Sequence, residues 1–358
     1  MVRMNTYVMQ PFTTHPLLRQ ADVQTMLARH RPRDIAIGQR EYPVLLDGGA
    51  DQSGFDPVAT VRLHGYYTPS LALFGRRGLV LVLHGWEGCS HSIYNLTTTD
   101  ALIRAGYDVF RLNLRDHGPA LHVDPYALNR GFFAATLLDE VANAVDQVAA
   151  FAGDRPFYIV GASLGGNLAL RLALRHARQP IPNLRKVVAS NPVLNPLRSA
   201  QALDRHPAYL RYFRSRWLRS LRAKQRLFPK LYDFTPLEAI PRTIPMTEWL
   251  IAHYGPNFGP FRSAEEYFAA YAVMGDAFAR LTVSTVIVTA ANDPVVPVAD
   301  FRALAAHPLL SVHVHPTGGH VGYMGGLPLR HDLPRLLMAV LLADDPMMSD
   351  SRLNNPGQ

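Results

Sequence analysis

Short apolar runs alternate along most of this chain with longer segments of helical periodicity. Residues 79–83 read Leu-Val-Leu-Val-Leu, and further runs rich in apolar and β-branched residues occupy 107–114, 158–160, 186–190, 283–289 and 311–315. Such runs are typical of strands buried on both faces. Helical spacing is found at 92–105, 136–151, 168–174, 298–306 and 334–342. The alternation predicts an α/β fold with a mostly parallel, doubly wound sheet and helices on both of its faces.

Three segments depart from this alternation. Residues 41–47 and 59–67 are predicted strands separated by the turn-rich segment 48–54, which indicates an entry hairpin at a sheet edge. Residues 1–39 are predicted to be an N-terminal leader with one short helix at most and no evident chemistry. Residues 344–358 form a polar tail that is predicted to be disordered.

The alternation is interrupted between residues 195 and 280. This stretch is rich in Pro, Arg and aromatic residues and has no β-branched strand run until residue 283. We interpret it as a mostly helical cap inserted into the α/β core. The predicted organisation is therefore a core in two parts, 40–194 and 281–343, with the cap at 195–280 between them.

The composition predicts the cellular compartment and shows that the excess positive charge lies in one segment. The apolar fraction of 48% and charged fraction of 18% are those of a soluble globular protein. The one cysteine, Cys89, excludes an intrachain disulfide, and we find neither an apolar signal core nor an uncharged apolar run of ~18 residues. We therefore expect a cytoplasmic protein. The net charge of +8 resides in one segment, because nine Arg or Lys residues and no acid lie between Arg205 and Lys230.

The pattern Gly-x-Ser-x-Gly occupies residues 161–165, directly after a predicted strand and before a predicted helix. A turn this sharp requires small residues on either side of the serine, which Gly161 and Gly165 supply, and it lifts the Ser163 hydroxyl clear of the sheet. Ser163 is therefore a candidate nucleophile. The alternative is an ordinary serine in a glycine-containing strand–helix junction.

A serine nucleophile needs a base and a group that orients the base. Asp293 follows the strand at 283–289, and His320 lies in a glycine loop after the strand at 311–315. Loops at the carboxyl ends of parallel strands meet on one side of the sheet, so we expect Ser163, Asp293 and His320 to form a catalytic triad. Taken singly, Asp293 could equally start an Asp-Pro turn, and His320 competes with fourteen other histidines.

The second requirement is a pair of amides to bind an oxyanion. The Leu164 amide begins the helix after the serine, and the Trp86 amide follows the strand at 79–83 through His84 and Gly85, so we predict that these two amides form the oxyanion hole. His84 is interpreted as a brace for this loop. Cys89 is interpreted as a packing residue.

Two other groups of residues have a structural interpretation and a functional one. His313 and His315 share one face of a predicted strand but have no third ligand spaced to complete a metal site, so no metal is predicted. The basic segment predicts an amphipathic helix, with apolar positions at Leu210, Phe213, Trp217 and Leu221 and with Arg211, Arg214, Arg219, Arg222 and Arg226 between them. It is either a solvated face or a peripheral contact with an anionic membrane surface; nucleic-acid binding lacks any accompanying fold signature.

Taken together, the chain resembles the YheT-like (type 4) branch of the α/β-hydrolases, a family of predicted esterases that includes animal lipid hydrolases. It departs from that family at Asp22-Val23, where members tend to carry His-Leu. The resemblance implies an α/β-hydrolase fold, hydrolysis of carboxylic esters with acylglycerols or phospholipids as substrates, and no cofactor. It rests on Leu-His-Gly-Trp-Glu-Gly at 83–88 with Tyr94, Gly-Ala-Ser-Leu-Gly-Gly-Asn at 161–167, Asn-Asp-Pro at 292–294, Gly-Gly-His-Val-Gly at 318–322, and Val-Gln-Thr at 23–25.

The functional hypothesis is a serine esterase that cleaves short or medium acyl esters, or acylglycerol-type lipids, through an acyl-enzyme on Ser163. Two alternatives use the same residues differently. One is an acyltransferase with an acceptor other than water, and the other is a hydrolase-fold binding protein without activity.

Overall fold

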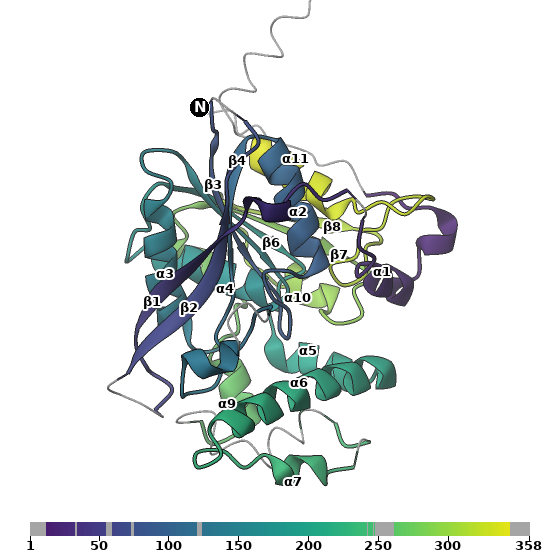
Figure 1. Ribbon diagram of the computed structural model, residues 1–358. Helices are drawn as coiled ribbons and strands as arrows, with labels where there is room; N and C mark the ends of the chain where they lie inside the picture. Colours follow the sequence, from purple (N-terminus) through teal and green to yellow (C-terminus); the bar gives the residue numbers. More distant parts are fainter. Residues whose placement is uncertain are drawn as a thin grey trace, which may run out of the picture.

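The computed structural model describes residues 12–343 except 33, 55–58, 73–74, 120–123, 242, 246 and 248–260. Within this part of the chain eight strands form one sheet in the order β1-β2-β4-β3-β5-β6-β7-β8 (Figure 1). β2 is antiparallel to β1 and β4, and the remaining neighbours are parallel, which confirms the mostly parallel sheet. The strands are β1 Tyr42–Ala50, β2 Thr60–Thr68, β3 Gly78–Leu83, β4 Tyr107–Leu112, β5 Phe157–Ala162, β6 Leu184–Ser190, β7 Ser284–Ala290 and β8 Leu310–His315.

Helices cover both faces of this sheet. α3 and α4 pack against one face, and α2 and α11 pack against the other. The described core helices are α1 Ala21–Leu27, α2 Ile93–Arg104, α3 Leu138–Ala150, α4 Leu164–His176, α10 Val298–Arg302 and α11 Leu333–Leu342, with short 3₁₀ turns at Pro16–Leu18, Gly38–Arg40 and Pro125–Leu128.

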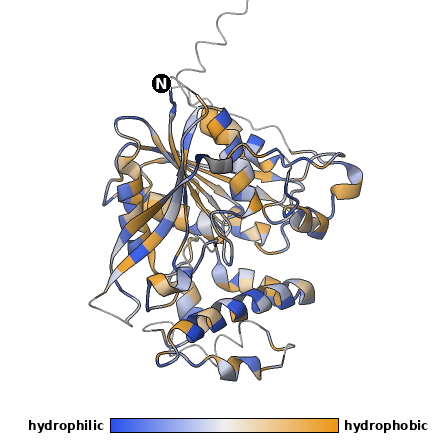
Figure 2. Ribbon diagram, viewed as in Figure 1, coloured by the Kyte–Doolittle hydropathy of each residue, from blue (hydrophilic) through white to orange (hydrophobic). Residues whose placement is uncertain are grey.

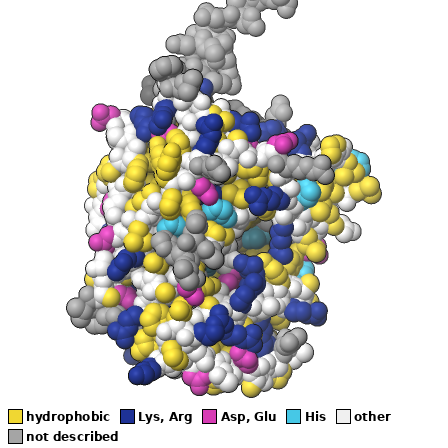
Figure 3. Space-filling model, viewed as in Figure 1, with side chains coloured by type: hydrophobic (Ala, Val, Ile, Leu, Met, Phe, Trp, Pro, Cys, Tyr) yellow, Lys and Arg dark blue, Asp and Glu magenta, His cyan; other side chains and the backbone are white. Residues whose placement is uncertain are grey.

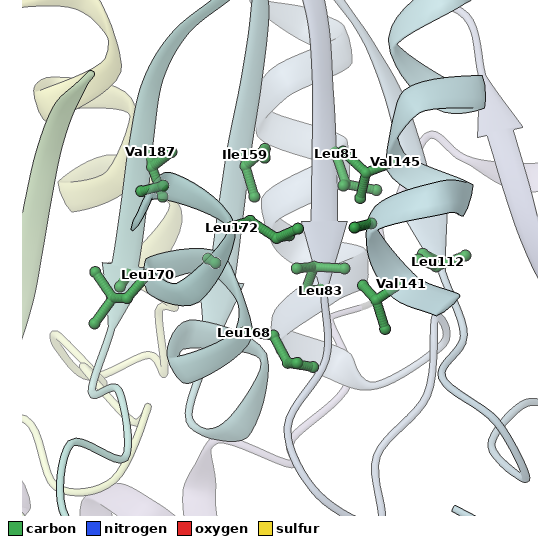
Figure 4. Packing of buried hydrophobic residues seen from close by; sticks show 14 of the residues in the cluster. Leu81, Leu83, Leu112, Val141, Val145, Ile159, Leu168, Leu170, Leu172 and Val187 are labelled. Carbon is green, nitrogen blue, oxygen red and sulfur yellow. The ribbon is translucent and has the colours of Figure 1, made fainter. Parts of the chain in front are cut away.

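The central strands β3 and β5 are buried along their whole length because helices lie on both sides of them. On the α3–α4 side, Leu81 and Leu83 meet Val141 and Val145 of α3, as Figure 4 shows. A second apolar cluster fills the space between the sheet and α2 and α11. Figure 2 shows the same arrangement as hydrophobic strands inside mixed-polarity helices. Continuous apolar runs in the sequence correspond to these doubly covered strands.

The first strand corrects a sequence interpretation. Residues 48–50 were expected to turn, but β1 continues through them to Ala50 and pairs with β2, with a register shift between Asp47 and Gly49. The glycines permit this irregularity, since Gly49 has φ of +83°. Residues 1–11 of the predicted leader and the predicted disordered tail, 344–358, lie outside the described residues.

Between β6 and β7 the chain leaves the sheet and forms the cap helices α5 Pro196–Asp204, α6 Pro207–Leu227, α7 Thr235–Glu238 and α9 Ala264–Ala269, followed by a 3₁₀ turn at Ala277–Arg280. In Figure 1 these helices lie together below the lower end of the sheet, where β3 and β5 terminate. They enclose a third apolar cluster that includes Leu210, Leu221 and Tyr267 and extends to Leu164 of the core. No helix among the described residues is both long and apolar enough to cross a membrane.

Candidate active site

Ser163 lies at the bend between β5 and α4 in a backbone conformation that L-residues rarely adopt, with φ of +56° and ψ of −119°. The two flanking glycines are required by close contacts. A Cβ on Gly161 would lie 2.1 Å from the Gly165 carbonyl oxygen, and a Cβ on Gly165 would lie 2.4 Å from the Leu83 carbonyl oxygen. Strand and helix can therefore approach closely enough to hold the serine in its strained bend.

The structure brings Ser163, His320 and Asp293 into direct contact. His320 Nε2 lies 2.9 Å from Ser163 Oγ, and His320 Nδ1 lies 2.9 Å from Asp293 Oδ2. Their loops follow β5, β7 and β8, so three carboxyl ends of the parallel sheet supply one chain of hydrogen bonds. With the Nδ1 proton donated to Asp293, Nε2 is left to accept the Ser163 proton.

The Asp293 carboxylate has hydrogen-bond partners in addition to His320. It accepts hydrogen bonds from the Asn191 side-chain amide at 2.8 Å and from the amides of Val295 and Val296 at 2.8 and 3.0 Å. The side chain is fully buried. Three donors therefore hold the carboxylate in place against His320. Asn191 was missed by sequence reasoning, although its position directly after the buried strand β6 is where site residues gather in such sheets.

The two predicted oxyanion donors both line the cavity that contains Ser163 and His320. Among the described residues, neither the Trp86 nor the Leu164 amide donates to a protein acceptor. The Trp86 loop lies against the serine, since a Cβ on Gly85 would be 3.0 Å from Ser163 Cβ. The Gly85 amide donates to the Tyr94 hydroxyl at 2.8 Å, which leaves the Trp86 amide as the available donor of this loop.

His84 is buried beneath that loop, and its two ring nitrogens join the loop to the segment that follows β4. The Leu114 amide donates to Nε2 at 3.1 Å, so Nδ1 carries the proton and donates to the Gly85 carbonyl at 2.8 Å. Burial and the neighbouring His117 lower the pKa of His84 to about 3, which keeps the imidazole neutral. This geometry agrees with a bracing role.

The leader segment contributes to the site, contrary to the expectation that it has no chemistry. The His320 amide donates to Thr25 Oγ1 on α1 at 2.9 Å. Gln24 is fully buried and bonds to both the amide and the carbonyl of Met324, at 2.6 and 3.0 Å. The loop that carries His320 is thus held on both sides by one short helix. The sequence predicted one short helix at most in this segment. The apolar pattern of the seven residues of α1 could not indicate which part of the fold the helix packs against.

A cavity of about 410 Å³ opens at Ser163 beneath the cap. Its wall is largely aromatic and comes from both the core loop and the cap: Trp86 stacks on Phe213 of α6 with ring centroids 5.4 Å apart. Other rings that line it are Trp217, Tyr267, Phe268 and Tyr271. Apolar walls with a few polar groups at one point are typical of pockets for small organic ligands.

The basic helix α6 is less exposed than its sequence indicates. Arg214 was expected on the polar face but is 4% exposed, because it caps the carbonyls of Ile240 and Pro241. Lys224 is also buried and forms an ion pair with Asp116 of the core at 2.9 Å. Arg214 thus joins two segments within the cap, and Lys224 attaches the cap to the core. Arg211, Arg219, Arg222 and Arg226 are exposed on the surface of the cap, and Figure 3 shows Lys and Arg atoms on the lower part of the visible face.

The other candidates show no arrangement for chemistry. Among the described residues no group of three or more His, Cys, Asp or Glu side chains is placed to hold a metal ion. His315 accepts a hydrogen bond from the Phe12 amide at 2.8 Å. Burial raises the pKa of the Cys89 thiol, which favours the unreactive thiol over the thiolate.

The fold and the elbow geometry define an α/β hydrolase. The model of the Alpha/beta hydrolase family matches residues 79–332, and the chain belongs to this family. No curated protein sequence matches the chain.

Two acylaminoacyl peptidase structures show the same fold at low sequence identity. An acylaminoacyl peptidase from Pyrococcus horikoshii superposes with a TM-score of 0.51 at 11% identity, over 86% of this chain and 42% of that one. An acylaminoacyl peptidase bound to Z-Gly-Gly-Phe-chloromethyl ketone gives a TM-score of 0.52 at 12% identity with the same coverage. The chain thus spans less than half the length of these peptidases. The Pyrococcus furiosus esterase Pf2001 gives a TM-score of 0.45 at 13% identity, over 81% of this chain and 90% of that one.

Proposed function

We propose that this protein is a serine hydrolase that cleaves carboxylic esters through an acyl-enzyme on Ser163. The observation that carries the proposal is the unbroken hydrogen-bond chain from Ser163 through His320 to Asp293, at the edge of a largely apolar cavity. Membership of the α/β-hydrolase family supports it. We further propose that the chain belongs to the YheT-like branch, with short or medium acyl esters or acylglycerol-type lipids as substrates.

In the proposed reaction, His320 Nε2 takes the Ser163 proton while Oγ attacks the ester carbonyl carbon. The tetrahedral oxyanion accepts hydrogen bonds from the amides of Trp86 and Leu164. Its collapse breaks the ester C–O bond, and the alcohol leaves with the proton from His320. Water then gives a proton to His320, attacks the acyl-enzyme and releases the carboxylic acid, which restores Ser163. Asp293 orients the imidazole and stabilises its cation throughout.

The cap supports the choice of an acyl substrate. Aromatic rings such as Phe213, Trp217 and Phe268 form an apolar wall in which a hydrocarbon chain would be removed from water. The exposed arginines of α6 support a peripheral encounter with anionic membrane surfaces, where such lipids are found. We propose that the protein acts in the cytoplasm, at or near such surfaces.

The test compares wild type with Ser163→Ala on p-nitrophenyl esters of graded acyl length. We expect kcat to fall by on the order of 10⁶-fold in the variant. Ser199→Ala is the matched control, because Ser199 also lines the cavity but its hydroxyl has no hydrogen-bond partner among the described residues. Unchanged hydrolysis by Ser163→Ala, or failure of a fluorophosphonate to label wild-type Ser163, would contradict the proposal.

A further inference from the structure

Two arginines line the cavity from opposite parts of the chain. Arg29 follows α1 of the leader segment, and Arg216 lies on α6 of the cap. Both guanidinium groups approach the Tyr212 ring, at 3.9 Å for Arg29 and 5.8 Å for Arg216. The leader and the cap thus bring two positive charges to one place in the cavity wall.

Neither arginine is neutralised by a carboxylate among the described residues, unlike the buried Arg111 and Arg115, which form ion pairs. Arg216 is half-buried and donates from Nη2 to the Glu87 carbonyl oxygen at 2.7 Å, while its Nε is buried and has no acceptor in the described part of the chain. A half-buried guanidinium with uncommitted donors carries an electrostatic cost that an anionic ligand would offset.

Among the described residues that line the cavity, Glu87 is the one acidic residue. Its carboxylate accepts a hydrogen bond from Ser220 at 2.8 Å, one helical turn beyond Arg216, so it already has a partner. The two cations outnumber this carboxylate. Arg216 also contacts the proposed oxyanion loop, because it donates to the carbonyl oxygen of Glu87, the residue that follows Trp86.

From this geometry we propose that Arg29 and Arg216 form a subsite for an anionic oxygen group, a phosphate or a carboxylate, carried by the ester substrate. This inference rests on the proposed function and narrows its substrate class to esters with such a group near the scissile bond. Arginine suits this role because its planar N–H fork matches the oxygens of phosphate and carboxylate. Tyr212 positions the two guanidinium groups by contact with its ring.

The experiment uses paired substrates below their micelle concentrations. 1-Hexanoylglycerol 3-phosphate is compared with 1-hexanoylglycerol for an anion on the alcohol side, and the p-nitrophenyl half ester of glutaric acid with p-nitrophenyl pentanoate for an anion on the acyl side. We expect wild type to favour the anionic member of at least one pair by about tenfold or more in kcat/KM at low salt, and less in 0.5 M NaCl.

The double variant Arg29→Met/Arg216→Met should lose that preference, so that its kcat/KM values for the anionic and neutral members of a pair become equal within about threefold. Arg219→Met is the matched control, since Arg219 is an exposed arginine of the same helix that does not line the cavity. The inference is overturned if wild type shows no preference, or if the double variant lowers both members of a pair equally.

A binding measurement separates this inference from the proposed function. Calorimetry on Ser163→Ala should give a Kd for 1-hexanoylglycerol 3-phosphate about tenfold lower than for 1-hexanoylglycerol, and addition of the two Arg→Met changes should remove the difference. If wild type hydrolyses neither member of either pair but this difference in Kd is found, the subsite stands and the ester reaction fails. With the p-nitrophenyl pair measured in the same way, equal Kd values within both pairs would end the subsite proposal whatever the activity.

Discussion

The backbone amide of His320 donates a hydrogen bond of 2.9 Å to the hydroxyl of Thr25, a residue 295 positions earlier in the chain. The same hydroxyl donates to the Ala21 carbonyl at 2.8 Å, so it joins the histidine loop to the frame of α1. The histidine loop and α1 are also in close contact next to this hydrogen bond, because a Cβ on Gly319 would lie 2.6 Å from the Ala21 carbonyl oxygen. The position of the His320 imidazole therefore depends on a helix near the N-terminus.

Replacement of Thr25 by Val should lower kcat by about tenfold to a hundredfold with little change in KM. The loss of the hydroxyl leaves the His320 amide without its acceptor, and a small displacement of the imidazole from Ser163 is costly to the reaction. Steady-state kinetics on p-nitrophenyl butyrate would measure the effect.

Thr25→Ser is the matched control, because serine keeps the hydroxyl and loses only a methyl group. We expect it to retain most of the wild-type kcat. Equal losses in the Val and Ser variants would assign the effect to packing of α1, and a Val variant as active as wild type would show that the contact does not position His320.

Replacement of Tyr94 by Phe should lower kcat by about tenfold and leave the thermal midpoint within a few degrees of wild type. The phenol oxygen is the acceptor for the Gly85 amide, and without it the loop that presents the Trp86 amide loses one of the hydrogen bonds that hold it. Tyr126→Phe is the control, since the Tyr126 hydroxyl donates to Ser220 of the cap instead. An unchanged kcat in the Tyr94 variant would argue against this loop as an oxyanion donor.

Sequence reasoning predicted most of the sheet because its strands are covered on both faces and therefore read as continuous apolar runs. It also placed Ser163, Asp293 and His320 at strand ends, where the structure brings them together. It did not predict the contacts of Thr25 and Asn191, although Thr25 belongs to the Val-Gln-Thr at 23–25 on which the family resemblance partly rests. Their roles depend on hydrogen bonds across distant segments, and a single Thr or Asn carries no periodicity that would predict such a partner.

Stability at acid pH should depend on His84. Its pKa is lowered to about 3 in the fold, below the ordinary value of 6.5, so between these values the unfolded chain binds one more proton at this site. The free energy of unfolding should therefore decrease as pH falls below 6.5, by up to about 1.4 kcal/mol per pH unit from this residue. Denaturant unfolding at pH 7, 6, 5 and 4.5 would measure that slope.

His84→Gln should flatten this pH dependence relative to wild type, even though it lowers the free energy of unfolding at pH 7. A comparison of the two proteins at each pH removes the contribution of other groups, such as Glu140, whose pKa is raised to about 7 by burial. The exposed His30 provides the control substitution, His30→Gln. Parallel curves for wild type and the His84 variant would contradict the prediction.

The exposed face of α6 should bind anionic vesicles and not neutral ones. Arg211, Arg219 and Arg226 are exposed on this helix, and each basic residue near an anionic surface contributes about 1 kcal/mol of attraction. Their joint replacement by Gln should thus weaken partition onto phosphatidylglycerol vesicles by on the order of 100-fold in a co-sedimentation assay. The matched control replaces three exposed arginines of the core by Gln, namely Arg62, Arg178 and Arg185. If both triple variants weaken vesicle binding equally, the net charge of the protein determines binding and α6 has no special part in it. If wild type binds neither kind of vesicle, the exposed face of α6 is a solvated surface only.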